Sequence, residues 1–369
     1  MKQLKVIIAG GGTGGHIFPA VAIGHTLKKM RPDAELLFVG AKGKMEMEKV
    51  PLEGFTIIGL DIAGFNRSNM LKNIFLPFKL LKSAWDAREI IKKYQPDVVV
   101  GVGGYASFPV LNAAQGMGIP TIIQEQNSFA GKSNKILGKK AKAICVAYEN
   151  MEQFFPKESI KVTGNPVRNV ISESTCTQEE GLRHFGLTNE KRTILIVGGS
   201  LGAKSINEAV DKYLSKIVGV DNQIIWQTGK PYFEQAKNSA QIFGEKVKVH
   251  EFIKEMDKAY AAADIVISRA GALAIAELCI VAKPVIFVPY PYAAEDHQTS
   301  NAMALVKKGA AIMIKDEDVS AQLSDVLVAL IADTNKQKEM STQLKQLAIS
   351  NADERIAQYI IDLSNNKTI

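Results

Sequence analysis

Both halves of the chain contain a short apolar run, a glycine-rich turn and a helical pattern in that order. In the first half, apolar residues 4–9 lead into GGGTGG at 10–15, and a helical pattern follows over residues 17–30. In the second half, residues 193–197 lead into GGSLG at 198–202, and a helical pattern follows over residues 203–217. A strand, a glycine turn and a helix in succession begin a βαβ unit.

Other apolar runs of strand length alternate with helical stretches, at residues 35–39, 97–100, 223–227, 247–250, 264–268, 284–288 and 311–314. Such strands indicate parallel sheets covered by helices on both faces. A length of 369 residues is enough for two domains of about 100–200 residues each. We therefore predict an α/β fold of two Rossmann-like domains, residues 1–166 and 167–350, facing each other across a deep cleft. A C-terminal helix at about 351–365 is expected to pack back on the first domain.

Composition excludes several other classes of protein. Hydrophobic residues at 46% and charged residues at 22% exclude a mainly disordered, collagen-like or coiled-coil chain. No apolar stretch reaches the roughly 18–20 residues of a membrane span, and the first apolar run is too short for a signal peptide. The 3 cysteines form no metal-ligand pattern and suit a reducing compartment. A net charge of +7 is compatible with phosphate-rich ligands or an anionic membrane. The sequence shows no cluster of aromatic and basic residues of the kind that binds nucleic acid, so it disfavours a nucleic-acid-binding protein.

The first glycine loop leaves more than one interpretation open. Gly10, Gly12 and Gly15 match the G-x-G-x-x-G pattern of dinucleotide-binding enzymes, although the loop could also be a purely structural turn. A dinucleotide site needs an acidic residue at the carboxyl end of the second strand, roughly 20 residues further on. Glu35 has this spacing but begins its strand, and residues 40–42, at the exit of the strand, include no acid. The sequence therefore disfavours a nicotinamide or flavin enzyme.

Polar residues beside the glycine loops are candidates for chemistry. His16 follows the first loop directly and could accept a hydroxyl proton near neutral pH, or could bind a loop carbonyl. Residues 268–277 follow a strand and open a helix whose N–H groups could hold a diphosphate. Glu277 in this helix could accept hydrogen bonds from a ribose diol, or could be a plain surface residue. The polar loop 289–298 is suited to lining a pocket.

Together these segments resemble the family of membrane-associated N-acetylglucosaminyltransferases of peptidoglycan synthesis. The motifs that carry the resemblance follow the family's order and cover most of the chain: residues 11–20, 103–105, 124–127, 163–168, 198–203, 269–272 and 295–302.

The resemblance implies an inverting hexosyltransferase with the B-type glycosyltransferase fold. The enzyme would transfer N-acetylglucosamine from UDP-N-acetylglucosamine to the C4 hydroxyl of N-acetylmuramic acid in lipid I, the undecaprenyl-pyrophosphoryl-linked muramyl pentapeptide, and so form lipid II. It would act in cell wall synthesis, and hence in cell shape and division, at the cytoplasmic face of the inner membrane as a peripheral protein without a cofactor. The acceptor would bind the first domain, and the UDP sugar mainly the second.

The resemblance also implies roles for individual residues. We expect His16 to be the catalytic base, with Glu125 as the second candidate. The substrate-binding residues implied are Thr13, Gly14, Gly15 and Asn127 for the donor and its sugar; Tyr105, with His16 and Glu125, for the acceptor; Arg168 and Ser200 for the diphosphate; Ile253 for uracil; Ala272, Leu273, Ala274, Ile275, Ala276 and Glu277 for phosphate and ribose; and Gln298 for the sugar. Family members commonly have Thr at the position of Ala274, and some have Gln at the position of Thr299, so side-chain contacts at these two positions are open.

Two further segments match patterns that are associated with metal or membrane binding. Residues 316–318 match the D-x-D pattern of metal-dependent transferases but stand in a charged segment away from the glycine loops, so we predict no metal site. Residues 70–85 contain apolar side chains at helical spacing with lysines between them, namely Leu71, Lys72, Ile74, Phe75, Phe78, Lys79, Leu81, Lys82 and Trp85. This pattern could lie on an anionic membrane or pack into the core.

The sequence leaves three rival functions open. Two are other B-type enzymes, a diacylglycerol glycosyltransferase and a UDP-N-acetylglucosamine 2-epimerase. The third is a non-catalytic protein that binds nucleotide sugars, against which the position of His16 argues.

Overall fold

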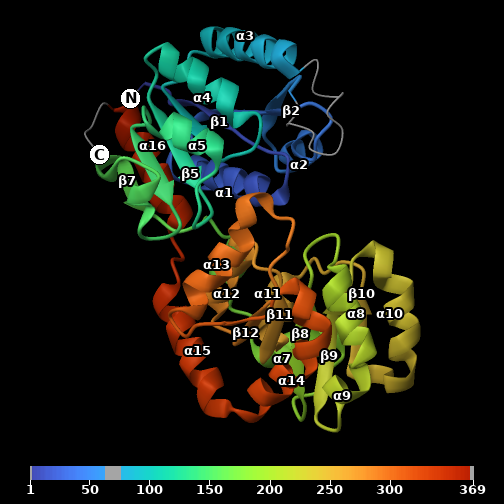
Figure 1. The fold of residues 1–369 in the computed structure, drawn as a ribbon. Helices are drawn as coiled ribbons and strands as arrows, with labels where there is room; N and C mark the ends of the chain where they lie inside the picture. The colour runs from blue at the N-terminus through green and yellow to red at the C-terminus, as the bar shows by residue number, and fades with distance from the viewer. Residues whose placement is uncertain (1, 63–75, 366–369) are drawn as a thin grey trace. The chain divides into compact units, whose positions relative to one another are not determined.

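The computed structural model describes residues 2–62 and 76–365. Its internal contacts divide the chain into two compact units, Met1–Arg168 with Ser350–Ile369, and Asn169–Ile349 (Figure 1). Each unit is built on a parallel sheet with helices packed against it. The predicted α/β class with two parallel sheets is therefore confirmed.

The first unit contains a 7-stranded sheet in the order β3-β2-β1-β4-β5-β6-β7. Its strands are β1 Lys5–Ala9, β2 Glu35–Ala41, β3 Thr56–Leu60, β4 Val98–Gly101, β5 Thr121–Glu125, β6 Ala143–Val146 and β7 Ile160–Val162. Its helices are α1 Gly14–Met30, α2 Glu46–Leu52, α3 Leu76–Tyr94, α4 Ser107–Gly116, α5 Lys132–Gly138 and α16 Ala352–Ser364. The chain runs outward from β1 to β3 and then returns to β4 on the other side of β1, so the strand order reverses between β1 and β4.

Alternate residues of β1 pack on opposite faces of this sheet. Val6 and Ile8 belong to a buried cluster with residues of α1 and α16. Ile7 and Ala9 belong to another buried cluster with residues of α3, α4 and α5. A strand covered on both faces needs apolar side chains at every position, which explains the continuous apolar runs in the sequence.

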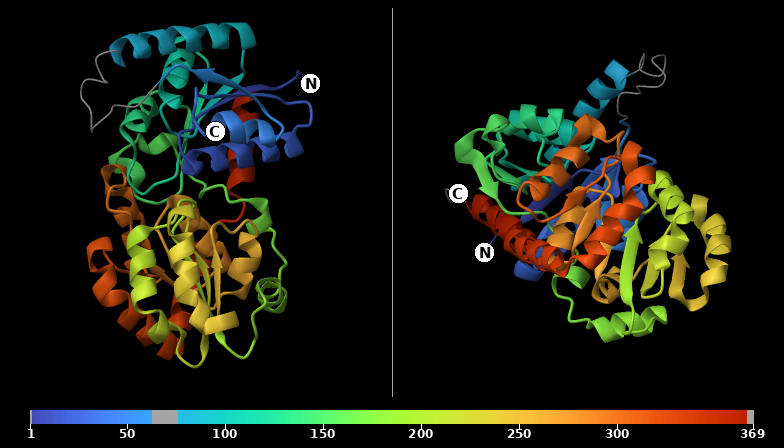
Figure 2. Two further views of the ribbon diagram at one scale, coloured as in Figure 1. Left: turned by 90° about the vertical axis from the view of Figure 1, so that its right-hand side faces the viewer. Right: turned by 60° about the horizontal axis from the view of Figure 1, so that its bottom comes forward.

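Helix α16 belongs to the first unit although it follows the whole of the second unit in the chain. Ile356 and Ile360 are fully buried in the cluster that contains α1. Thr26 of α1 donates a hydrogen bond to the buried carboxylate of Asp353 in α16. Figures 1 and 2 show the red α16 beside the blue α1.

The second unit contains a 6-stranded parallel sheet in the order β10-β9-β8-β11-β12-β13. Its strands are β8 Arg192–Val197, β9 Asn222–Gln227, β10 Val247–His250, β11 Ile265–Ser268, β12 Val285–Phe287 and β13 Ile312–Met313. Its helices are α6 Asn169–Ser172, α7 Gln178–Phe185, α8 Lys204–Lys212, α9 Leu214–Val218, α10 Phe233–Ala240, α11 Met256–Ala262, α12 Ala272–Val281, α13 His297–Val306, α14 Val319–Ala332 and α15 Thr334–Leu347. The strand order of this sheet reverses between β8 and β11.

Two helices differ from the boundaries that the sequence predicts. Helix α1 begins at Gly14, so Thr13 is its N-cap residue and His16 lies in its first turn. The helix expected over 203–217 is divided into α8 and α9 at Tyr213, where φ is −111° and ψ is 17°. Tyr213 packs against the core of the second unit, and this packing accompanies the break. Among the described residues, no helix is both long and apolar enough to cross a membrane.

Candidate active site

The loops after β1 and β4 meet at the point where the strand order of the first sheet reverses, which is where open α/β sheets bind their ligands. The backbone N–H of Gly11 donates to the carbonyl of Gly103 over 3.3 Å. A Cβ atom on Gly104 would lie 2.1 Å from the carbonyl oxygen of Gly11, and Gly104 has a φ of +84°. Only glycine fits this contact, because any side chain would force the two loops apart.

His16 lies between these two loops. Its Nδ1 is 3.1 Å from the carbonyl oxygen of Gly11 and 3.3 Å from Oγ1 of Thr13. A Cβ atom on Gly103 would lie 2.8 Å from Nε2, so the imidazole ring rests against the backbone of that residue. A hydrogen bond to this carbonyl requires a hydrogen on Nδ1, because a carbonyl oxygen can only accept, and this tautomer has the lone pair of the neutral ring on Nε2. Both roles that the sequence leaves open, binding a loop carbonyl and accepting a proton, are thus compatible in one tautomer.

The dinucleotide alternative does not fit the structure. Glu35 pairs with Lys5 at the amino ends of β2 and β1, opposite to the edge that carries the glycine loops. The expectation that this carboxylate lies away from the ligand edge is confirmed.

Glu125 ends β5 and is almost completely buried. Its Oε1 accepts hydrogen bonds from the backbone and side-chain nitrogens of Asn127, at 3.1 and 3.3 Å. Its Oε2 accepts from the backbone of Gly131 at 3.1 Å and from Nδ2 of Asn134 at 2.8 Å. Burial raises the pKa of the Glu125 carboxyl, and these hydrogen bonds oppose the shift. The carboxylate therefore holds the loop after β5, including Asn127, in place.

A network of buried amides joins β5 to the segment 163–168. Gln124 donates to Oδ1 of Asn165 at 2.9 Å, and Asn165 donates to the carbonyl of Gln126 at 3.0 Å. Gln126 donates to the carbonyl of Val102 at 2.7 Å. The polar motif residues around Glu125 thus support the loops from inside the first unit.

Two other predicted residues of the first unit have different surroundings. Tyr105, just before α4, has 51% of its surface exposed. Arg168 is half-buried and is the last residue of the first unit before α6. The structure therefore groups Thr13 with His16 and Asn127 with Glu125, each pair in direct contact.

In the second unit, the loops after β8 and β11 also lie where the strand order reverses. Ser200 is exposed in the loop after β8. A Cβ atom on Gly202 of this loop would lie 1.8 Å from the carbonyl oxygen of Thr228, so the loop packs tightly on the end of β9. Ala272, Leu273 and Ala274 form the first turn of α12, whose N-terminus favours an anion.

Three residues that are predicted to bind the UDP sugar make hydrogen bonds inside the second unit. Glu277 is buried, and its Oε2 accepts a hydrogen bond from the hydroxyl of Tyr260 at 3.0 Å, so it is not a plain surface residue. The backbone N–H of Ile253 donates to Oε1 of Gln227 at 2.8 Å. Oε1 of Gln298 accepts from the backbone of Tyr290 at 3.0 Å.

Asp316, the first residue of the D-x-D match, follows β13 and contacts Arg269 in the loop after β11. Its Oδ1 accepts from Arg269 and from Oγ of Ser205. Arg269 also donates to the carbonyls of Val288 and Pro289, at 3.0 and 3.1 Å. This cluster ties the loop after β11 to the loop after β12. Among the residues that the structure describes, no group of three or more His, Cys, Asp or Glu is placed to hold a metal ion.

The sequence alone did not single out several residues that support these loops, among them Glu46, Asn134, Gln227 and Tyr260. Gln227 could have been found, because it ends a predicted strand at the ligand edge of its sheet. The others lie in elements that no glycine motif marks, and their roles depend on contacts made only in the folded chain.

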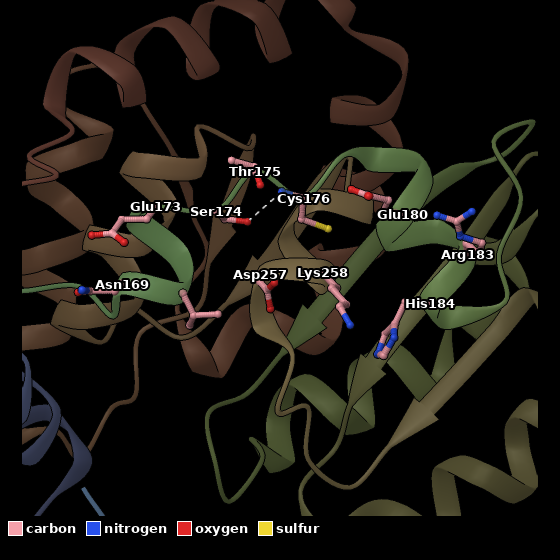
Figure 3. Close-up of a pocket in the computed structure, with 11 residues that line it drawn as sticks. Asn169, Glu173, Ser174, Thr175, Cys176, Glu180, Arg183, His184, Asp257 and Lys258 are labelled. Carbon is pink, nitrogen blue, oxygen red and sulfur yellow. Dashed lines mark hydrogen bonds between the residues drawn. The ribbon is translucent and has the colours of Figure 1, made fainter. Parts of the chain in front are cut away.

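A surface groove of the second unit is separate from these residues. It has a volume of about 720 Å³ and is lined by residues of α6, α7, α11 and the segment between α6 and α7 (Figure 3). None of the residues predicted from sequence lines it.

Comparison with known proteins defines the class of protein. Residues 6–146 match the N-terminal domain of glycosyltransferase family 28, and residues 193–356 match the C-terminal domain of that family. The chain belongs to glycosyltransferase family 28, and the predicted resemblance, B-type fold and enzyme class are confirmed.

Comparison with individual proteins indicates which members of the family this chain resembles. The chain is 53% identical over 366 residues, 98% of each sequence, to the UDP-N-acetylglucosamine--N-acetylmuramyl-(pentapeptide) pyrophosphoryl-undecaprenol N-acetylglucosamine transferase of Bacteroides thetaiotaomicron. It is similar to the crystal structure of MurG from Acinetobacter baumannii, with a TM-score of 0.79 and 31% identity over 97% of this chain and 99% of that one. A UDP-N-acetylglucosamine 2-epimerase, at 16% identity over 100% of this chain and 98% of that one, has a TM-score of 0.65 and shares the fold alone.

Proposed function

We propose that this enzyme transfers N-acetylglucosamine from UDP-N-acetylglucosamine to the C4 hydroxyl of the N-acetylmuramic acid of lipid I, and so makes lipid II. The relative from Bacteroides thetaiotaomicron, at 53% identity over nearly the whole chain, carries this reaction in its name. The structural observation that supports the proposal is the contact between Nδ1 of His16 and the carbonyl of Gly11, which favours the tautomer with a basic Nε2. A protein that only bound nucleotide sugars would need no base at this position.

The reaction is a single displacement that inverts the anomeric carbon. Nε2 of His16 takes the proton of the acceptor hydroxyl while the hydroxyl oxygen forms its bond to C1 of the sugar. The bond from C1 to the β-phosphate oxygen breaks, and UDP leaves with its electron pair. Prearranged dipoles stabilise the developing negative charge on the leaving group. We assign this role to the first turn of α12 and the loop that contains Ser200, with Arg168 as a further positive charge.

The two units have different tasks in this proposal. The first unit binds the acceptor through residues near His16 and Tyr105, with Thr13, Gly14 and Gly15 turned to the donor and Asn127 to the transferred sugar. The second unit binds the UDP sugar. Glu277, aligned by Tyr260, accepts hydrogen bonds from the ribose diol. The backbone of Ile253 contacts uracil, and Gln298 contacts the sugar.

We infer that His16, and not Glu125, is the base. Both oxygens of Glu125 already accept two hydrogen bonds each inside the first unit. A carboxylate that took a substrate proton from this position would give up bonds that hold its own loop. Glu125 acts instead by positioning the loop that carries Asn127.

Transfer of labelled N-acetylglucosamine onto a lipid I analogue, with and without a chelator, tests the function. We expect labelled lipid II at the same rate in both samples. Binding of UDP-N-acetylglucosamine without any product would support a non-catalytic binding protein, and conversion of the free UDP sugar without lipid I would support an epimerase. A rate that falls on chelation would show a metal requirement.

We also infer that the enzyme lies on the cytoplasmic face of the membrane, where its lipid-anchored acceptor is held. Helix α3 exposes Leu81 and Trp85, with 71% and 64% of their surface accessible, one helical turn apart. Lys82 lies between them in the sequence and also contacts Asp86. Of the stripe predicted from sequence, Leu71, Lys72, Ile74 and Phe75 lie outside the described residues. An exposed apolar pair beside lysines is suited to an anionic bilayer.

The double substitution Leu81→Ser and Trp85→Ser should weaken binding to vesicles of phosphatidylcholine with phosphatidylglycerol by at least about 10-fold, because each apolar side chain contributes about 1.5–3 kcal/mol when buried. Vesicle flotation measures the change. Leu52→Ser, at an exposed leucine of α2, serves as the control and should bind as the wild type does. Unchanged binding by the double variant would dismiss this surface.

A further inference from the structure

Glu46, the first residue of α2, places a buried carboxylate beneath the glycine loop. Its Oε2 accepts a hydrogen bond from the backbone N–H of Gly12 at 2.8 Å. Its Oε1 accepts from the backbone N–H of Ala41, the last residue of β2, at 2.9 Å. The side chain therefore connects the loop after β1 to the end of the neighbouring strand.

Two glycines leave the space that this side chain occupies. A Cβ atom on Gly11 would lie 2.3 Å from Oε1 of Glu46, and one on Gly40 would lie 2.5 Å from its Cγ. Neither contact is sterically possible, so a side chain at either position would displace the carboxylate. Glycine at positions 11 and 40 therefore allows Glu46 to approach the loop, whether or not it also allows a ligand to approach.

A single peptide group lies between Glu46 and His16. The N–H of Gly12 and the carbonyl of Gly11 belong to one planar unit and point in opposite directions. Its N–H donates to Glu46, and its carbonyl oxygen is 3.1 Å from Nδ1 of His16. Hydrogen bonds at the two ends of one peptide polarise and strengthen each other. The carboxylate and the imidazole are thus coupled without touching.

We propose that Glu46 is a positioning residue for the transfer reaction. It fixes the orientation of the peptide between Gly11 and Gly12, and the carbonyl of that peptide selects the His16 tautomer with hydrogen on Nδ1 and the lone pair on Nε2. The geometry corresponds to a carboxylate and histidine pair in which a peptide group is inserted between the partners. The catalytic consequence rests on the proposed function, whereas the tautomer is a property of the protein without substrate.

The tautomer is measured by NMR of the full chain labelled with ¹⁵N-histidine, at a pH of about 8.5, where a histidine of ordinary pKa is neutral. The chain has 5 histidines, and comparison with His16→Ala assigns the signals of His16. We expect the form with hydrogen on Nδ1 to dominate in the wild type. A dominant Nε2–H form would overturn the proposal by itself, whether or not any variant folds.

Glu46→Gln tests the link to catalysis. The amide keeps the volume of the side chain but can accept from only one of the two backbone N–H groups. We expect a mixture of His16 tautomers and an unchanged KM for UDP-N-acetylglucosamine. We expect kcat to fall about 10- to 100-fold, which is the usual loss when the outer hydrogen-bond partner of a metal-binding histidine is removed. Glu46→Asp, which keeps the charge but withdraws it by one methylene, should shift both measurements in the same direction.

Glu48→Gln is the matched control, because Glu48 lies exposed on the same helix and undergoes the same chemical change. It should leave tautomer and kcat unchanged. A Glu46→Gln enzyme with the wild-type tautomer and kcat would overturn the proposal, as would an equal loss in Glu48→Gln. A wild-type enzyme with the expected tautomer but no transfer activity would refute the proposed function and leave the positioning of His16 by Glu46 intact.

Discussion

His16→Ala should lower kcat for transfer to lipid I by about 10²- to 10⁴-fold, the usual contribution of a positioned acid or base. Binding of UDP-N-acetylglucosamine should stay close to that of the wild type, because the groups that we assign to UDP, apart from Arg168, lie in the second unit. Steady-state transfer and isothermal titration calorimetry measure the two quantities separately. A large loss of affinity for the UDP sugar with a normal kcat would mean that His16 binds the donor and does not take the proton.

Two further variants separate proton transfer from the support of the loop. His16→Asn can still donate a hydrogen bond to the carbonyl of Gly11 but has no basic nitrogen, so it should be as inactive as His16→Ala. Recovery of activity in His16→Asn would show that only the loop contact matters. His25→Ala is the control, since His25 lies on the same helix and pairs with Glu53 over 3.2 Å, and it should keep full activity.

Glu125→Gln should destabilise the fold because each carboxylate oxygen accepts from one backbone N–H and one side-chain amide. Whichever way the new amide turns, its NH₂ group faces the backbone N–H of either Asn127 or Gly131. One buried donor left without an acceptor costs about 1–3 kcal/mol. We expect a melting temperature lower by about 4–8 °C for a loss near 2 kcal/mol. Glu125→Ala, which leaves all these donors without the carboxylate, should be less stable still.

Thermal melting and activity together test the role of Glu125. In Glu125→Gln, kcat measured well below the melting temperature should fall less than in His16→Ala. Glu152→Gln, at an exposed glutamate of the same unit, should leave both quantities unchanged. A Glu125→Gln protein that melts like the wild type but loses as much kcat as His16→Ala would make Glu125 the base.

The framework of both sheets could be predicted because it depends on local patterns. The strands are buried on both faces, so their apolar runs are continuous, and glycines mark the turns where loops approach each other. The position of His16 follows from the same pattern, since it directly succeeds such a turn. The break at Tyr213 could not be predicted, because it accompanies packing against a core that is formed by distant segments.

Glu125 and Glu46, which support the loops, were harder to predict because their roles depend on contacts that form only in the folded chain. Glu125 stands in the polar run QEQN, which resembles an exposed loop, yet the structure buries it at the end of β5 and surrounds it with donors. Glu46 lies in a helix rich in charged residues, and nothing in that helix distinguishes it from Glu48. Only the contact of Gly11 and Gly40 with its side chain shows which glutamate is used.

The return of α16 to the first unit affects the order in which the units can fold during synthesis. Ile356, Ile360 and Leu363 complete a core that begins at Leu4, and they are translated only after Asn169–Ile349. At about 5–20 residues per second, the ribosome needs roughly 10–40 seconds for the intervening segment. The second unit, continuous in sequence, can therefore fold while the first still exposes the apolar face that α16 will cover. A nascent chain stalled before residue 350 would carry this open face, and chaperones that recognise apolar surface should bind it there.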